Sequence, residues 1–322
     1  MNAKALLLAR LAAARAALWQ ELVGLDNPTI ATEHVCGTWT AADALAHVAA
    51  WDEIHTTRIK LILEGRPGEI VLSEADPINA RVFAERHGWS LEHAVDACNG
   101  ARREFLTLIY PVSWEEMIRL HRTANRAEYS IQDFTERRAF HDSLHADDLR
   151  SWRKHAQPAS RPGPGAVLRA ALDAAREELL AWVALVPEEE RGTLTVCGNW
   201  NVQDVLGHVS DWERYALDGL DAMAAGRAAG AEYDGDEDQW NHEHATARRG
   251  QGWTTTWEDL GAARRELLVR LDGMTDADLA RTVPTQWSDT DNPYGWIRVC
   301  LEHDREHAEI MRETLTARRQ TG

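Results

Sequence analysis

Two sets of three histidines occur at matched positions in the two halves of the sequence, and each set could hold a metal ion. They are His47, His141 and His145 in the first half and His208, His303 and His307 in the second. The last two members of each set have the spacing H-x-x-x-H, which on a helix places both imidazoles on one face with Cβ atoms about 5 to 6 Å apart. Three neutral imidazoles without a fourth protein ligand leave coordination positions open for water or substrate, as catalytic zinc sites do. We therefore expect a divalent transition metal, with zinc, nickel, iron and manganese all able to occupy such a site.

A packing role is the alternative for these histidines. A single H-x-x-x-H spacing is common on helices, and buried histidines usually serve local hydrogen bonds. The repetition of the whole three-histidine pattern favours metal binding over packing, because most of the other histidines have no counterpart in the other half.

The sequence repeats itself at a nearly constant offset. His208 follows His47 by 161 residues and His303 follows His141 by 162. The segment VCGTW at 35–39 also recurs as VCGNW at 196–200. A register that changes by one residue over a whole domain indicates a tandem duplication of one fold.

The prolines and glycines of QPASRPGPG, residues 157–165, stop a helix and mark a linker. We therefore expect a first domain at 1–156, this linker, and a second domain at 166–322. Such a pair could bury a shared face as an internal pseudo-dimer, so we expect a monomeric chain.

The apolar residues of each half have helical spacing, and no stretch alternates as a strand would. Thr40 and Asn201 are suitable N-caps, each with an acid three residues later, so the helix that carries His47 or His208 is expected to begin there. The H-x-x-x-H pairs lie on the core-facing side of the last long helix of each half. We expect further short helices at 76–87 and 233–249. The predicted fold is all-α, with two tandem four-helix bundles.

Repeated tryptophans and asparagines accompany the histidines. Trp51 and Trp212 lie one helical turn after His47 and His208, where they could wall a pocket, although packing in the bundle is the simpler role. Asn79 matches Asn241 in the other half. We expect a substrate pocket at Trp51, Trp212, Asn79 and Asn241.

Other repeated residues have simpler interpretations. Cys36 and Cys197 precede a helix start, which favours a thiolate, but burial as small apolar residues is the more common role. The run ARRE at 101–104 and 263–266 is interpreted as a solvated helix face. Asp142 and Asp304 point away from the ligand face by helix geometry, so neither is assigned as a general base.

The composition excludes several classes of protein. The net charge of -17 repels phosphate backbones, so nucleic acid is not an expected partner. No long uncharged apolar run is present, and the N-terminal apolar stretch is interrupted by Arg10 and Arg15, so we expect neither membrane insertion nor a signal peptide. The four cysteines contain no C-x-x-C pair, which is typical of reduced thiols in a cytoplasmic protein.

The pattern W-[TN]-x-x-D-x-L-x-H-V-x-x-W at 39–51 and 200–212, with the late H-x-x-x-H, resembles the DinB-like superfamily of metal-binding four-helix bundles. That superfamily includes thiol-dependent transferases and the N-terminal domain of mycothiol-dependent maleylpyruvate isomerase. The resemblance implies a nickel, zinc or iron site on the six histidines given above, and a low-molecular-weight thiol such as mycothiol as a cosubstrate. A further branch protects producers of DNA-damaging natural products.

Three functions are consistent with these patterns. The first is a metal-dependent transferase or hydrolase that adds a thiol or water to a small electrophile, in detoxification or resistance. The second is a self-resistance protein that sequesters a hydrophobic reactive metabolite without metal chemistry. The third is a non-catalytic helical scaffold. The sequence assigns no residue to proton transfer.

Overall fold

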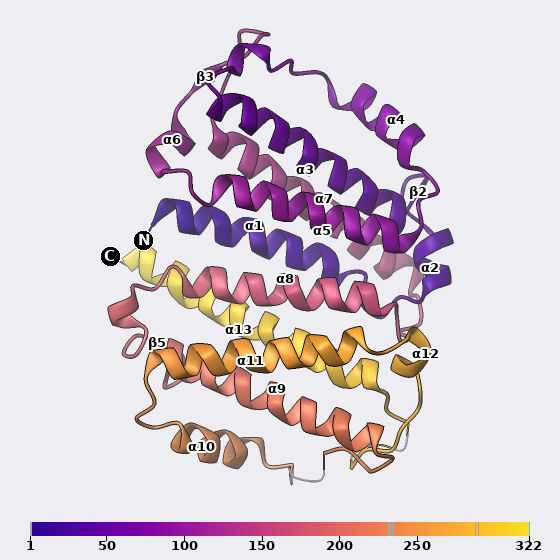
Figure 1. The fold of residues 1–322 in the computed structure, drawn as a ribbon, viewed down its shortest axis with the longest axis vertical. Helices are drawn as coiled ribbons and strands as arrows, with labels where there is room; N and C mark the ends of the chain where they lie inside the picture. Colours follow the sequence, from indigo (N-terminus) through magenta and orange to yellow (C-terminus); the bar gives the residue numbers. More distant parts are fainter. Residues whose placement is uncertain (1, 231–232, 234, 287, 289, 322) are drawn as a thin grey trace. The chain divides into compact units, whose positions relative to one another are not determined.

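The computed structural model describes residues 2–230, 233, 235–286, 288 and 290–321. Within these residues the regular structure is almost entirely helical, which confirms the all-α prediction (Figure 1). It divides into two compact units, Asn2–Arg161 and Pro162–Gly322. Each unit is described by itself below.

Four long helices form the first unit. They are α1 (Ala3–Gln20), α3 (Ala41–Leu63), α5 (Leu91–Ile109) and α7 (Ile131–Ala156). Helix α3 packs against α5 and α7, and α1 packs against α7. Shorter elements connect them: α2 (Asn27–Thr32), the 3₁₀ helix η1 (Pro67–Glu69), α4 (Ala75–Arg86) and α6 (Trp114–Ile118).

The second unit has the same order of long helices. They are α8 (Gly165–Val183), α9 (Val202–Ala224), α11 (Trp253–Asp272) and α13 (Pro293–Thr321). Helix α13 packs against α8 and α9, and α9 packs against α11. The short elements are η2 (Glu188–Glu190), α10 (Glu237–Ala247) and α12 (Asp276–Leu279).

A small hairpin and a capping box fix the start of the helix that carries the first histidine of each set. Strands β1 (His34–Cys36) and β2 (Trp39–Thr40) precede α3, and β5 (Thr195–Cys197) and β6 (Trp200–Asn201) precede α9. Gly37 and Gly198 make the turns at φ of +61° and +54°, a conformation that costs glycine little. Thr40 and Asn201 then cap the two helices as predicted, each paired with the acid three residues later.

Apolar stripes on the long helices form the cores. Leu11 of α1, Phe105 of α5 and Phe134 of α7 are almost fully buried in the first unit. Leu172 of α8 and Leu267 of α11 are equally buried in the second. These positions follow the helical period that the sequence shows, since burial of one face is what stabilises such helices.

The sequence gives no sign of the strands, and the described residues contain three hairpins with strands of two or three residues, the third formed by β3 (His121–Arg122) and β4 (Glu128–Tyr129). Such segments are too short to show an alternating pattern. The expected extra helices are present as α4 and α10, with bounds that differ from the predicted ones by a few residues.

Candidate metal centres

The three histidines of the second unit converge on one point between α9 and α13. Nε2 of His303 lies 2.8 Å from Nε2 of His208 and 3.0 Å from Nε2 of His307. A metal bound to three imidazoles at about 2.1 Å places neighbouring ligand nitrogens about 3.0 to 3.4 Å apart. The two observed distances lie at or just below the short end of this range, so the three nitrogens are close enough to share one ion.

These three rings are neutral at pH 7, as metal ligation requires. Burial, together with the other two histidines, lowers the pKa of His208 to about 2. Burial lowers the pKa of His303 to about 3 and that of His307 to about 4. The Asn241 side chain forms a hydrogen bond with His208, the kind of outer contact that orients a metal ligand. Nδ1 of His307 is buried without a hydrogen-bond partner.

The histidines of the first unit also converge, between α3 and α7. Nε2 of His47 lies 2.9 Å from Nε2 of His141, and one nitrogen of each of the three rings lies within 4.8 Å of the others. Nδ1 of His145 lies 3.5 Å from a carboxylate oxygen of Asp148. Both predicted sets of three are thus brought together in space.

A buried arginine distinguishes the first set from the second. Nη2 of Arg138 donates a hydrogen bond to Nδ1 of His141 at 2.5 Å. Because the guanidinium is only a donor, Nδ1 must supply its lone pair, and the ring proton of a neutral His141 then lies on Nε2. A protonated Nε2 can donate to His47 but cannot bind a metal. The first set therefore fits a divalent ion less well than the second.

Arg138 belongs to a buried cluster of five charged residues beneath the first histidine set. Arg15 lies 2.9 Å from both Asp52 and Asp142, and Arg102 lies within 3.0 Å of both. Nε of Arg138 lies 2.9 Å from Oδ1 of Asp52. The prediction that Arg102 lies on a solvated face is wrong: it is 5% exposed because two buried carboxylates bind it.

A smaller cluster lies beneath the second set. Arg176 lies 2.9 Å from Asp304 and 3.0 Å from Glu213, and Arg264 binds the same two acids. Arg264 is therefore also buried, against the solvated face predicted for it. The third arginine has no counterpart here, because Cys300 takes the place three residues before His303 that Arg138 has before His141.

The two clusters consequently differ by one charge. Three arginines and two aspartates give the first cluster a net charge of +1, whereas two arginines, Glu213 and Asp304 give the second a net charge of zero. A buried positive charge disfavours a nearby divalent cation. Charge and hydrogen bonding thus agree that the second set is the better candidate for a metal centre.

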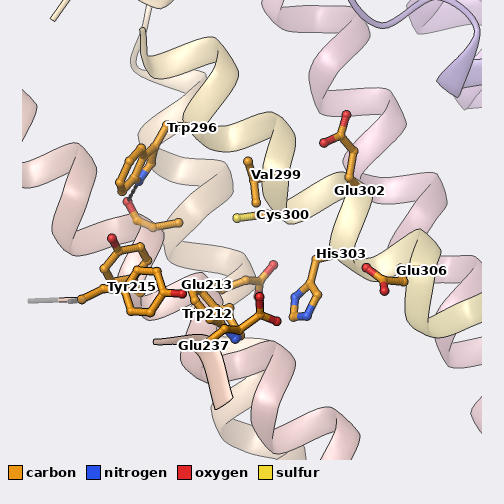
Figure 2. A pocket seen from close by; sticks show the side chains of 12 residues that line it. Trp212, Glu213, Tyr215, Glu237, Trp296, Val299, Cys300, Glu302, His303 and Glu306 are labelled. Carbon is orange, nitrogen blue, oxygen red and sulfur yellow. Dashed lines mark hydrogen bonds between the residues drawn. The ribbon is translucent and has the colours of Figure 1, made fainter. Parts of the chain in front are cut away.

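A pocket of about 430 Å³ opens beside the second set, and His303 forms part of its wall (Figure 2). Its lining comes from α9, α10, α13 and the connection before α10. The lining residues are Trp212, Glu213, Tyr215, Ala216, Tyr233, Glu237, Trp296, Val299, Cys300, Glu302, His303 and Glu306. Figure 2 shows the aromatic rings of Tyr215 and Trp296 on one side and His303 on the other.

Two large side chains occupy the corresponding space in the first unit. His55 lies eight residues after His47, where the second unit has Ala216, and Arg138 corresponds to Cys300. Both His55 and Arg138 are almost fully buried. A small cavity of about 10 Å³ borders His47 on the side of α4, away from Arg138. A hollow of about 570 Å³ along α3 and α4 contains none of the three histidines.

The tryptophans and asparagines singled out in the sequence form matched pairs. Nε1 of Trp51 donates to Oδ1 of Asn79 at 3.0 Å, and Nε1 of Trp212 donates to Oδ1 of Asn241 at 3.1 Å. Trp212 lines the pocket, and Asn241 accepts the hydrogen bond of its indole. Asn79 thus contacts Trp51, whereas Asn241 contacts both Trp212 and His208.

Several pocket residues were not predicted from the sequence, because these residues do not recur between the two halves of the chain. Tyr215, Glu237 and Trp296 line the pocket, yet nothing repeated marks them. Helical spacing from His303 could have found Trp296 and Cys300, which lie seven and three residues before it on α13. The equivalent positions of the first unit hold Phe134 and Arg138. Because the residue types differ, a comparison that looks for identical residues in the two halves does not find these positions.

The hairpin cysteines are protonated at neutral pH. Burial and a hydrogen bond to Asp148 raise the pKa of Cys36 to about 12, and burial also raises the pKa of Cys197. Neither thiol is therefore a reactive thiolate, which agrees with the packing role and disfavours the nucleophilic one.

The fold and these centres define an all-α protein in which paired helices present three histidines to one point. Residues 171–311 match the family model of the DinB superfamily, so the second unit is similar to the members of this superfamily. No curated protein and no solved structure matches the chain significantly. In the part of the chain that the structure describes, every helix is too short or too polar to cross a membrane.

Proposed function

We propose that the second unit is a metal-dependent enzyme that adds a low-molecular-weight thiol, or water, to a small electrophilic substrate. The observation that supports this proposal most is the position of His303, which belongs to the converging histidine set and also to the wall of the 430 Å³ pocket. A molecule in the pocket would therefore lie next to the open side of the metal centre.

In this proposal His208, His303 and His307 hold the ion through Nε2. A bound divalent metal would supply Lewis acidity and lower the pKa of a bound thiol or water. Trp212 and Trp296 would exclude water from the pocket and pack against the apolar part of the substrate. Asn241 fixes the ring of Trp212 and, through its hydrogen bond, the orientation of His208.

The aromatic walls favour a second candidate, sequestration of a hydrophobic metabolite without chemistry. Trp212, Tyr215 and Trp296 offer a large apolar contact surface with fixed ring positions. Trp296 is held by a hydrogen bond of 2.9 Å from its Nε1 to the carbonyl oxygen of Ala216. Binding of this kind would not need the histidines.

One experiment separates the two candidates. The full chain, loaded with zinc or nickel, is assayed for conjugation of a thiol such as mycothiol to a chlorodinitrobenzene electrophile, beside His208→Ala and His47→Ala. The proposal expects His208→Ala to abolish turnover, while His47→Ala leaves it near the wild-type rate. Equal turnover in all three proteins would refute the metal mechanism, and unchanged ligand affinity without turnover would support sequestration.

A further inference from the structure

One carboxylate oxygen in the pocket of the second unit is buried and unpaired. Glu213 is 1% exposed, and Oε1 accepts hydrogen bonds from Arg176 at 3.0 Å and from Arg264 at 2.6 Å. Oε2 has no hydrogen-bond partner. A buried acceptor without a donor costs about 1 to 3 kcal/mol, so a ligand that donates to it would recover this energy.

The first unit places an additional arginine beside the equivalent carboxylate, as an ion pair. Asp52 lies five residues after His47, as Glu213 lies five residues after His208. Each oxygen of Asp52 is approached by arginines, and the guanidinium of Arg138 lies 2.9 Å from Oδ1. In the second unit Cys300 replaces this arginine, and the space is open.

The rest of the pocket wall also favours a positive charge. Glu237, Glu302 and Glu306 contribute carboxylates, and none of the lining residues that the structure describes is a lysine or arginine. Glu302 is paired with Arg298 at 3.2 Å. The aromatic rings on the other side offer π faces, which attract organic cations at close range.

From these observations we infer that the pocket binds a small organic cation with a planar guanidinium or amidinium group, which pairs with Oε2 of Glu213 and takes the place that the Arg138 side chain has in the first unit. The inference rests on the proposed function, because it takes this pocket as the substrate site. A monocation would also raise the net charge of the second cluster from zero to +1, the value of the first. By the electrostatic argument made for Arg138, the cation should therefore bind more weakly to the zinc-loaded protein than to the metal-free protein.

Three probes of the same shape and different charge test the inference. Benzamidine, benzamide and benzoate carry charges of +1, 0 and −1, and each is titrated calorimetrically into the full chain, both metal-free and loaded with zinc. We expect benzamidine to bind at least about tenfold more tightly than benzamide, a difference of about 1.4 kcal/mol. Benzoate should give no saturable heat with the metal-free protein.

Three variants locate the contact. Glu213→Gln should reduce the preference for benzamidine over benzamide to less than about threefold, since the charge-assisted bond is lost. Cys300→Arg should abolish benzamidine binding in the metal-free protein, because the new guanidinium fills the site. Glu309→Gln on the same helix is the matched control, since this exposed glutamate pairs with Arg312 and does not line the pocket, and it should leave the preference unchanged.

The inference is overturned if benzamide binds as tightly as benzamidine, if no probe gives saturable heat, or if a helical, folded Cys300→Arg protein still binds benzamidine. Failure of the proposed function has a different outcome. If the chain binds no transition metal but metal-free protein keeps the charge preference, the metal mechanism fails and the cation site stands.

Discussion

Removing the Arg138 side chain should allow the first histidine set to bind a divalent metal ion about as tightly as the second set does. An ion on Nε2 of His141 would lie roughly 6 Å from the guanidinium, given a metal–nitrogen bond of about 2.1 Å. At an effective dielectric constant of about 20, one positive charge repels a divalent ion at that distance by about 5 kcal/mol. The two aspartates reduce this value but leave the cluster one positive charge above its counterpart, so a weakening of the order of a thousandfold is expected.

Calorimetric titration of zinc into chelator-treated protein measures this difference. The wild-type chain should show one tight site, and Arg138→Ala should show two. Arg137→Ala on the same helix is the control, because Arg137 is exposed and should leave the single tight site unchanged. Two equally tight sites in the wild-type chain, or a folded Arg138→Ala protein that still has one, would refute the reasoning.

Three further predictions concern the second unit. Gly219→Ala should destabilise the chain by about 1 to 3 kcal/mol, because a Cβ would overlap an indole ring, whereas Gly100→Ala meets open space and should not; denaturant melts compare them. Burial raises the pKa of Glu178 to about 7, above its unfolded value of 4.5, so the stability it contributes is present below pH 4.5 and is lost as the pH rises to 7. Glu178→Gln should therefore raise the stability at pH 8 by up to about 3 kcal/mol and flatten the pH profile of melting. Asn241→Ala should weaken zinc binding about 10- to 100-fold in a chelator competition, with Asn79→Ala as the matched control that has little effect on the tight site.

Local signals explain why much of the architecture could be predicted. Thr40 and Asn201 cap their helices through contacts with residues only three positions later, and such a spacing is visible in the sequence. The histidine sets were recognisable because a helical turn brings His303 and His307 together, and the repeat supplies the third member.

The interior charges could not be predicted in this way. Arg102 has the spacing of a surface residue, and its burial depends on Asp52 and Asp142, which lie 50 and 40 residues away on other helices. The pocket depends on differences between the halves. Ala216 and Cys300 leave a cavity only because of how the surrounding helices pack. A sequence pattern does not distinguish a small residue that lines a cavity from one that packs closely.

The Arg138 side chain fills the space that is a pocket in the second unit, and this difference should make the two units unfold at different temperatures. The first unit, in which Arg138 fills this space and both buried carboxylates of the cluster are paired, should melt at a higher temperature than the second, which has the 430 Å³ pocket and an unpaired Oε2 on Glu213. The chain would then unfold in two calorimetric steps, and a single melting temperature would not describe it. A small molecule bound in the hollow would shift only the lower step, so that the upper step serves as an internal standard within the same polypeptide.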